Sequence, residues 1–457
     1  MYSIHAFLLQ KELFRSPEPV KTTVVSSFTD TPALQQIARQ ADSDYILFYT
    51  GTSPIELHPY AIGRMYQIAE SNDGALFYSD YQEIRQGKKI HHPTLEYQTG
   101  SIRNDFDFGQ LLLFRNDSFQ QVVAQMNTDY RFAALYELRL SISRLGKIVH
   151  IPETLYTVQP TDLRLSGEKQ FDYVDPANRE VQLEMEAVCT AHLQAIGAWL
   201  APEFQRIDFG QENFAREASV IIPVRNRKRT IAEAVESALQ QQTDFSFNVI
   251  VVDNHSTDCT GQILTELSRR YPNLIHHIPA STELGIGGCW TEAILLPECG
   301  KFAIQLDSDD LYKDCHVLQR IVDTFYQENC AMVIGSYQMV DFKLEEIPPG
   351  LIAHREWTPD NGRNNALRIN GLGAPRAFYT PVLRQIKFPN VSYGEDYATA
   401  LAISRKYPIA RIYDPLYLCR RWEENSDHDL DIQQLNNYNF YKDKIRTLEI
   451  QARISGK

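Results

Sequence analysis

The second half of the chain alternates short apolar runs with segments of helical periodicity. Residues 219–224, 248–252 and 302–306 are largely apolar runs of strand length, as expected for strands buried on both faces of a parallel sheet. Apolar side chains at helical spacing follow at residues 231–241 and 261–270. This order predicts an α/β domain with a doubly wound, mostly parallel sheet flanked by helices.

Acidic residues follow two of the three predicted strands. Asp253 comes directly after residues 248–252, and residues 307–310 (Asp-Ser-Asp-Asp) come directly after residues 302–306. Because ligands of such sheets bind beyond the carboxyl ends of the strands, we expect these acids at one sheet edge. Carboxylates there suit Mg²⁺ or Mn²⁺, which can bridge the two phosphates of a nucleotide diphosphate. The alternative is a solvated acidic turn that caps the next helix.

Basic residues follow the first predicted strand. Residues 225–229 (Arg-Asn-Arg-Lys-Arg) place cationic donors at the same edge, where they either meet phosphate or stay solvated. Asp253 can accept a hydrogen bond from a base or a ribose, or cap the following helix. Each feature alone has a structural explanation, and their shared position favours a ligand site.

Four motifs occur in a characteristic order. They are residues 221–226 (Ile-Ile-Pro-Val-Arg-Asn), 252–258 (Val-Asp-Asn-His-Ser-Thr-Asp), 305–310 (Gln-Leu-Asp-Ser-Asp-Asp) and 393–397 (Tyr-Gly-Glu-Asp-Tyr). Over residues 217–430 this order resembles the family 2 inverting glycosyltransferases. The resemblance implies a GT-A (Rossmann-like) fold and transfer of a sugar, with inversion, from a nucleotide diphosphate sugar to a hydroxyl of a glycan or lipid-linked acceptor. A UDP-sugar is the first donor to expect.

The resemblance also implies roles for single residues. The residues expected to contact the donor are Pro223, Arg225, Asp253, Asp307 and Ser308. Asp307 and Asp309 would hold Mn²⁺ or Mg²⁺, and His428 is a further candidate ligand, with a lone surface histidine as the alternative. Asp396 would be the general base that deprotonates the acceptor hydroxyl. Its neighbour Glu395 diverges from it by about 100° on a helix, so only one of the two should face the acceptor.

One departure from the family concerns the diphosphate contact. Trp290 stands where the family usually has an arginine. We expect Arg225 or the pair Arg420 and Arg421 to substitute, while Trp290 either stacks on a ring or fills the core. Residues 370–376 lie where this fold commonly builds the acceptor pocket.

The first half of the chain repeats the second at low similarity. The alignment pairs residues 45–49 with 302–306, 75–82 with 331–338, 136–156 with 397–417, and 24–30 with 251–258. It places Thr50 and Thr52 opposite the metal-binding aspartates and Leu135 opposite Asp396. We therefore expect a degenerate glycosyltransferase-like domain with a structural, acceptor-guiding or partner-binding role. An unrelated α/β domain is the alternative.

A chain of 457 residues exceeds one ordinary core. We expect the degenerate domain at residues 1–165, a connecting helix and linker at 166–217, the catalytic domain at 218–430 and a C-terminal helix at 431–457. That last helix would dock on the core, pair with a second copy in a homo-oligomer, or touch a membrane surface as a peripheral contact; docking is the favoured expectation.

Composition limits the remaining classes of function. The net charge of -13 argues against nucleic acid as a partner, because no basic face stands out. No apolar run approaches the roughly 20 residues that span a bilayer, and no secretory leader is evident. Seven scattered cysteines fit a reducing compartment, so a cytoplasmic location is expected.

Two other functions stay open at this point. A non-catalytic nucleotide-sugar-binding or protein-interaction scaffold could be built from two such domains. The intact Asp307, Asp309 and Asp396 favour the enzyme, since the first half shows what their loss looks like. A nucleotidyltransferase would share the sheet and the acidic site. It usually needs a glycine-rich phosphate loop near its N-terminus, which this sequence lacks.

Overall fold

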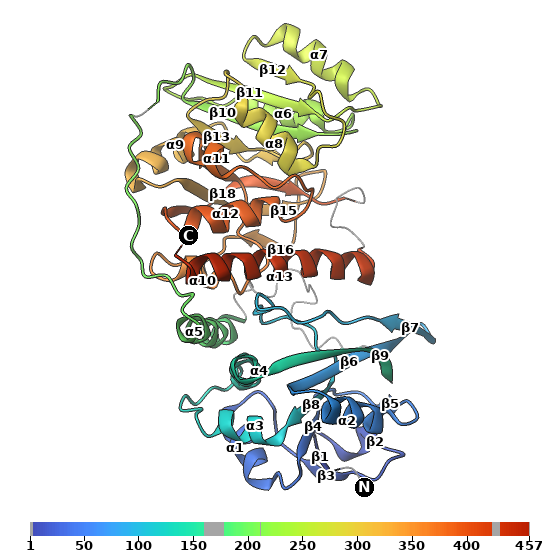
Figure 1. Ribbon diagram of the computed structural model, residues 1–457. Coiled ribbons are helices and arrows are strands. Elements are labelled where there is room, and N and C mark those ends of the chain that lie inside the picture. Colours follow the sequence, from blue (N-terminus) through green and yellow to red (C-terminus); the bar gives the residue numbers. More distant parts are fainter. Residues whose placement is uncertain (1–2, 160–177, 211, 423–429, 457) are drawn as a thin grey trace. The chain divides into compact units, whose positions relative to one another are not determined.

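The computed structural model describes residues 3–159, 178–210, 212–422 and 430–456 (Figure 1). It divides into two compact units. Unit 1 comprises Met1–Trp199, Leu367–Ile369 and Leu430–Lys457, and unit 2 comprises Leu200–Ala366 and Asn370–Asp429. The connecting helix α5 (Arg179–Ala195) and the C-terminal helix α13 (Ile432–Ile454) both belong to unit 1. In the described part of the chain, none of the helices has the length and apolar character needed to cross a membrane.

Unit 2 is built on a mixed sheet of nine strands in the order β12-β11-β10-β13-β17-β15-β18-β14, with β16 added on β15. The strands are β10 (Ala218–Val224), β11 (Phe247–Asp253), β12 (Leu274–His277), β13 (Phe302–Gln305), β14 (Leu311–Tyr312), β15 (Met332–Val340), β16 (Glu346–Ile352), β17 (Arg376–Tyr379) and β18 (Ile409–Arg420). Strands β12, β11, β10 and β13 are mutually parallel, whereas β17 is antiparallel to both β13 and β15. This is the GT-A type of sheet that the sequence predicted.

The helices of unit 2 follow the predicted alternation. They are α6 (Ile231–Leu239), α7 (Thr260–Arg270), α8 (Ile286–Leu295), α9 (Val317–Glu328), α10 (Gly362–Asn365), α11 (Thr380–Ile386) and α12 (Glu395–Ser404). Helix α9 shows why they form. It buries Val317, Ile321 and Phe325, which recur every four residues and share one face, and this face packs on β15 and β18.

Unit 1 also has a nine-stranded sheet, in the order β2-β5-β9-β6-β8-β4-β1-β3, with β7 added on β6. The strands are β1 (Ile4–Leu8), β2 (Phe14–Arg15), β3 (Lys21–Val24), β4 (Tyr45–Tyr49), β5 (Ile55–Leu57), β6 (Gly74–Arg85), β7 (Lys88–His92), β8 (Leu111–Arg115) and β9 (Lys147–Val158). The helices besides α5 and α13 are η1 (Lys11–Leu13), α1 (Thr31–Gln40), α2 (Ala61–Ser71), α3 (Asn116–Val123) and α4 (Ala134–Leu145). Successive residues of β4 enter two separate cores, one on each face of the sheet.

The two sheets have the same topology. Read from its other edge, the unit 1 order β3-β1-β4-β8-β6-β9-β5 corresponds to β11-β10-β13-β17-β15-β18-β14 in unit 2. Each equivalent pair of neighbours is parallel or antiparallel in both units. Unit 2 adds β12, α6 and α8, and unit 1 has β2 and η1 between its first two aligned strands.

The agreement extends to the register of single residues. Tyr81 of β6 pairs with Tyr156 of β9, and Tyr337 of β15 pairs with Tyr417 of β18. Both strand pairs also shift register directly before the first tyrosine. These are the residues that the sequence alignment places opposite each other, so the apolar framework sets the same register twice.

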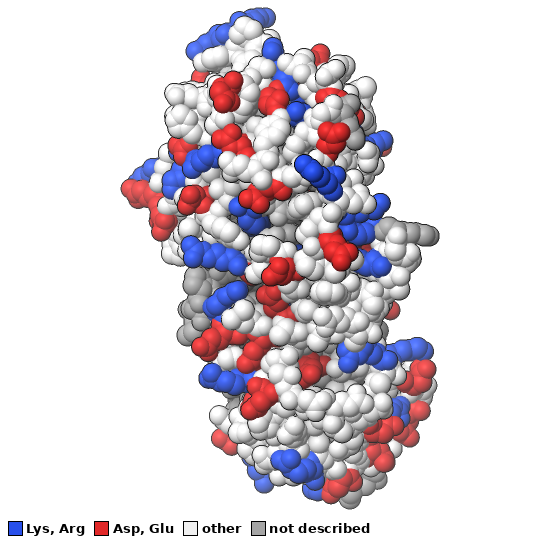
Figure 2. All heavy atoms as spheres, turned by 90° about the vertical axis from the view of Figure 1, so that its left-hand side faces the viewer, with Lys and Arg blue, Asp and Glu red and all other residues white. Residues whose placement is uncertain are grey.

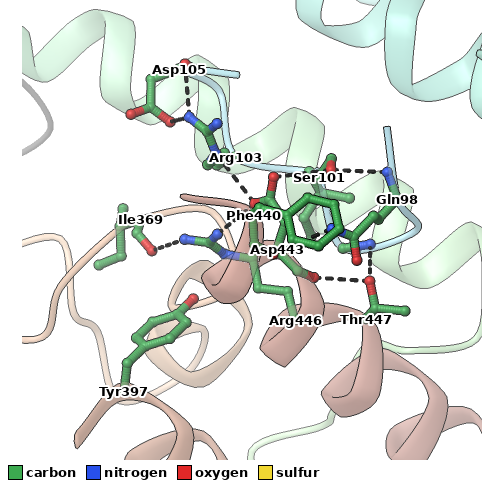
Figure 3. Close-up of polar contacts among 12 residues, drawn as sticks. Gln98, Ser101, Arg103, Asp105, Ile369, Tyr397, Phe440, Asp443, Arg446 and Thr447 are labelled. Carbon is green, nitrogen blue, oxygen red and sulfur yellow. Dashed lines mark hydrogen bonds and ion pairs between the residues drawn. The ribbon is translucent and has the colours of Figure 1, made fainter. Parts of the chain in front are cut away.

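Helix α13 is fastened within unit 1 by a buried carboxylate (Figure 3). Asp443 Oδ1 lies 3.2 Å from Arg103 Nε and 2.8 Å from Arg446 Nη1, and Asp443 Oδ2 accepts a hydrogen bond of 3.0 Å from the Ser101 hydroxyl. Arg446 Nη2 donates to the carbonyl oxygen of Ile369 at 2.8 Å. The side chain of Asp443 is 1% exposed. One buried negative charge therefore compensates two buried positive charges.

Substitution Asp443→Asn should destabilise unit 1 by about 3–5 kcal/mol, because it removes the buried counter-charge that Arg103 and Arg446 share and leaves Arg103 only its half-exposed partner Asp105. Urea denaturation followed by circular dichroism measures the change. The matched control is Glu153→Gln, which breaks the exposed ion pair with Arg64 and should cost under about 1 kcal/mol. Equal losses in the two variants would contradict a stabilising role for the buried charge.

Candidate active site

The carboxyl ends of β11, β10 and β13 form one edge of the unit 2 sheet. Asp253 is the last residue of β11 and pairs with Val224 at the end of β10, while Asp307 follows β13 on the other side of β10. Pro223 and Arg225 lie at the end of β10 between them. Parallel pairing thus brings together, at one sheet edge, acids that are over fifty residues apart in the sequence.

Asp307 is held by its neighbours in the sheet. Gln305 Nε2 donates to both carboxylate oxygens of Asp307, at 2.9 and 3.0 Å, and the backbone N–H of Asp307 donates to the Tyr417 hydroxyl at 2.8 Å. Burial raises the pKa of Asp307, and the charge of Asp309 adds to that rise, while Arg376 opposes it. A bound cation would relieve this cost.

Asp310 and Ser308 are more deeply buried than Asp307 and Asp309. Both are buried, and Asp310 Oδ1 accepts the backbone N–H of Arg420 at 2.7 Å. Burial, followed by the charges of Asp309 and Asp307, raises the pKa of Asp310 well above its usual value. Asp310 therefore supports the turn, and the positions left for ligands are Asp307 and Asp309.

Asp309 is partly exposed and lies among cationic and aromatic groups. Its Oδ2 accepts a hydrogen bond of 3.1 Å from Trp422 Nε1 and lies 3.8 Å from Arg227 Nε. Arg420 Nε donates to the backbone carbonyl of Asp309, and Arg420 Nη1 pairs with Glu233. The acidic turn thus has two guanidinium groups beside it, from residues about 190 positions apart.

The arginines of the basic run at residues 225–229 differ in their exposure to solvent. Arg225 is exposed, whereas Arg227 is half-buried and reaches the acidic turn. Asn226 between them has a positive φ of 55°, which turns the chain there. Sequence reasoning selected the run but named Arg225; the geometry brings Arg227 to Asp309.

Asp253 is fixed as a buried acceptor. Its Oδ1 accepts the backbone N–H of Ser256 at 2.9 Å, and its Oδ2 lies 3.3 Å from His276 Nε2. Burial alone would raise the pKa of Asp253, but the hydrogen bonds from His276 and Ser256 outweigh it and the pKa is lowered. His276 comes from the short strand β12, and its position beside Asp253 had no signal in the sequence.

Helix α12 separates its two leading acids. Asp396 is 27% exposed, and its Oδ2 lies 2.5 Å from Arg376 Nη1. Glu395 is buried, and its Oε2 has no hydrogen-bond partner among the described residues. Burial, reinforced by the charge of Asp396, raises the pKa of Glu395 to about 8. Of these two acids, only Asp396 reaches the surface.

Substitution Glu395→Gln should stabilise the protein increasingly as pH rises. Near pH 4 Glu395 is protonated in both the folded and unfolded chain. Between its usual pKa and about 8, the unfolded chain releases this proton and the folded chain keeps it, so wild-type stability falls with pH. The variant lacks this loss and should gain on the order of a few kcal/mol at pH 8 relative to pH 4. Urea denaturation at several pH values measures it.

The control for this measurement is Glu266→Gln on the exposed face of α7, which should leave the pH dependence of unfolding unchanged. A difference between Glu395→Gln and wild type that stays constant from pH 4 to pH 8 would contradict the raised pKa of Glu395.

Two other predicted site residues have clear outcomes. Trp290 is 5% exposed and packs against Phe378 and Phe388, with ring centroids 5.7 and 5.2 Å apart, so it fills the core.

His428, the further candidate metal ligand, lies outside the described residues. Within the described ranges, no group of three or more His, Cys, Asp or Glu side chains is placed to hold a metal ion.

Comparisons with known proteins address the family. Residues 219–386 match the Glycosyl transferase family 2 model. A poly(ribitol-phosphate) beta-glucosyltransferase of Bacillus spizizenii is 24% identical over 230 residues, covering 49% of this chain and 35% of that protein. The minor teichoic acid biosynthesis protein GgaA of Bacillus subtilis is 32% identical over 111 residues, covering 23% of this chain and 24% of that protein. The chain thus spans well under half the length of these curated relatives.

Two solved structures show a low similarity to this chain. S. aureus TarS 1-349 in complex with UDP-GlcNAc is 23% identical, with a TM-score of 0.40 over 52% of this chain and 72% of that one. Mannosyltransferase PcManGT from Pyrobaculum calidifontis, in complex with GDP-Man and Mn²⁺, is 15% identical, with a TM-score of 0.36 over 63% of this chain and 86% of that one. The family match spans β10 to α11 and three of the four predicted motifs. Unit 2 of this chain carries a glycosyltransferase family 2 domain.

Proposed function

We propose that this chain is a metal-dependent inverting glycosyltransferase. It moves a sugar from a nucleotide diphosphate sugar to a hydroxyl of a glycan or lipid-linked acceptor. The observation that carries the proposal is that acids from two separate segments of unit 2 are linked to neighbouring strands of its sheet. Asp307 and Asp309 lie at the end of β13, and Asp396 is joined to the neighbouring strand β17 through Arg376. The first set suits a cation and a diphosphate, and the second suits an acceptor hydroxyl.

In this proposal Asp307 and Asp309 hold Mn²⁺ or Mg²⁺. Asp307 fits such an ion, because burial, together with the charge of Asp309, already disfavours the ionised form of Asp307. When bound, the ion supplies positive charge to the diphosphate as it leaves the sugar. Asp253 accepts a hydrogen bond from the nucleoside, since its carboxylate is fixed by Ser256 and His276 at the same sheet edge.

Arg227 and Arg420 take the place of the diphosphate arginine that the family usually has at the position of Trp290. Both guanidinium groups border Asp309, and both stack on aromatic rings: Arg227 lies 5.8 Å from the Trp422 ring centroid, and Arg420 lies 5.0 Å from that of Phe342. Arginine held in this way keeps its charge and gives planar donors to phosphate.

Asp396 accepts the proton of the acceptor hydroxyl. The hydroxyl oxygen then bonds to the anomeric carbon as the bond to the diphosphate breaks on the opposite face, so one base suffices and the configuration inverts. Glu395 cannot share this role, because it is buried beside Asp396 with a pKa of about 8.

Unit 1 is a degenerate copy of this domain in our proposal. Its support is the equal topology and register of the two sheets. Thr50 and Leu135 replace Asp307 and Asp396, so these two positions of unit 1 cannot hold a cation or remove a proton as the acids would. We assign it a structural or acceptor-guiding role.

The first donors and acceptors to test follow from the family and the relatives. UDP-sugars with Mn²⁺ are screened by thermal stabilisation and by release of UDP. Poly(ribitol phosphate) is the first acceptor, because one relative is named for it. Binding of nucleotide sugar without transfer to any acceptor would favour the alternative of a non-catalytic scaffold.

Two substitutions separate metal-dependent binding from chemistry. Asp309→Asn should weaken nucleotide binding in the presence of Mn²⁺ by about 10–100-fold. Asp396→Asn should leave that affinity within about twofold and lower kcat by roughly 10²–10⁴-fold. Calorimetric titration and initial rates measure the two effects, with Asp323→Asn on the exposed face of α9 as control. Unchanged turnover in Asp396→Asn would remove this residue as the base.

The proposed contact of Arg227 with the diphosphate is tested by comparing two alanine substitutions. Arg227→Ala should weaken binding of a nucleoside diphosphate by roughly tenfold, since charge-assisted hydrogen bonds are lost, but should leave binding of the nucleoside unchanged. Arg225→Ala, two residues away and exposed, should leave both affinities unchanged. Equal effects of Arg227→Ala on nucleoside and nucleoside diphosphate would contradict the assignment.

On the face shown in Figure 2, Lys and Arg residues are interspersed with Asp and Glu residues. This face therefore does not present the concentrated basic surface that binding of nucleic acid needs.

A further inference from the structure

A continuous set of hydrogen bonds joins the carboxylate of Asp307 to that of Asp396. The Gln305 amide donates to Asp307 through Nε2, and its Oε1 accepts the backbone N–H of Arg376 at 3.1 Å. The Arg376 side chain then reaches Asp396, with Nη1 2.5 Å from Oδ2. The antiparallel pairing of β13 with β17 fixes the spacing of Gln305 and Arg376.

The Arg376 guanidinium is itself held in place. Its Nη1 also donates to the carbonyl oxygen of Gly373 at 3.1 Å. Gly373 has a φ of 99°, and a Cβ there would lie 2.9 Å from the His354 ring, so this turn needs glycine. Arg411 Nη1 donates to the carbonyl oxygen of the preceding residue, Leu372. The turn at Gly373 has little freedom to move, and it holds the Arg376 guanidinium where the guanidinium contacts Asp396.

The copy in unit 1 has lost this link together with the acids. The equivalent pairing of β4 with β8 places Phe48 opposite Leu112, where β13 and β17 have Gln305 and Arg376. Both Phe48 and Leu112 are buried. Since the sheet keeps its topology and register with apolar residues there, Gln305 and Arg376 are not required by the fold alone.

We propose that Arg376 is a positioning residue for the transfer, and that Gln305 ties it to the donor side of the site. The inference rests on the proposed function of Asp396. Arg376 orients the Asp396 carboxylate and keeps it ionised, and an arginine does not compete for the proton because it stays charged at all relevant pH values. Gln305 sets the base at a fixed place relative to Asp307, and so to the donor.

Other charged groups act on the same place. The charges of Asp396 and Asp307 favour the charged form of Arg376 against the effect of burial. Glu395 on α12 and Tyr417 on β18 lie beside the same guanidinium, and burial raises the pKa of each of them, so they stay protonated. Removing Arg376 leaves Asp396 beside acids alone. The proton affinity of Asp396 should then rise.

The test compares Arg376→Gln and Arg376→Lys with wild type. Arg376→Gln should keep nucleotide affinity with Mn²⁺ within about threefold, lower kcat about 10–100-fold, and move the acid limb of the pH profile of kcat/KM up by roughly 1–2 pH units. Arg376→Lys retains the positive charge, so its acid limb should return close to that of wild type. Its kcat should recover less, because lysine lacks the planar guanidinium that orients the carboxylate. The control Arg384→Gln removes an arginine that donates to the Ile294 carbonyl on α8, and should leave the rate unchanged.

A readout without turnover keeps this proposal separate from the proposed function. Each protein is titrated with acid against the same protein carrying Asp396→Asn, and the difference gives the pKa of Asp396 directly. A raised pKa of Asp396 in Arg376→Gln supports the link even if wild type transfers no sugar, in which case only the proposed function fails. An unshifted pKa of Asp396, or an equal loss of nucleotide affinity and kcat, overturns the role of Arg376.

Discussion

The cost of removing clustered carboxylates from water, increased by their mutual repulsion, is the constraint on which the unit 2 site depends. Asp307, Asp309 and Asp310 lie within four residues at the end of one strand, and the pKa values of Asp307 and Asp310 are raised mainly by burial. Such a cluster is stable only if opposite charges and donors surround it. They come from β17, in Arg376, and from the end of β18, in Arg420. The mixed half of the sheet is therefore what allows an acidic site at the end of the parallel half.

Unit 1 shows the same framework without that constraint. It keeps the strand order and register, yet Thr50, Phe48 and Leu112 stand where unit 2 has Asp307, Gln305 and Arg376. Without the acids that follow β13, the positions of Phe48 and Leu112 can be filled by apolar packing, which costs no desolvation of charge. The polar network of unit 2 is thus separable from its fold.

Local patterns explain how much of this the sequence could predict. Runs buried on both faces locate β10, β11 and β13, and parallel pairing then forces Asp253 and Asp307 to one edge. The repeat between the halves is readable because apolar alternation fixes strand register. Both the GT-A fold of unit 2 and the related topology of unit 1 were therefore within reach of the sequence.

The remaining features depend on distant partners. The basic run at residues 225–229 does not say which arginine turns inward, because that is set by the backbone at Asn226. His276 has a role only because β12 pairs with β11. For α13 the amphipathic pattern predicts docking, but of the two arginines that neutralise its buried Asp443, Arg103 lies some 340 residues away. No local signal identifies such a partner.

The two acids that begin α12 show how burial chooses between equivalent groups. A helix N-terminus favours negative charge, so Glu395 and Asp396 could both be explained as helix-stabilising acids. The equivalent helix α4 begins at Ala134, with Leu135 next, and forms without acids in these two positions. The acids of α12 are therefore not needed to start the helix. Burial then raises the pKa of Glu395 to about 8, while the partly exposed Asp396 is paired with Arg376, so the two neighbouring acids differ in environment although the sequence presents them alike.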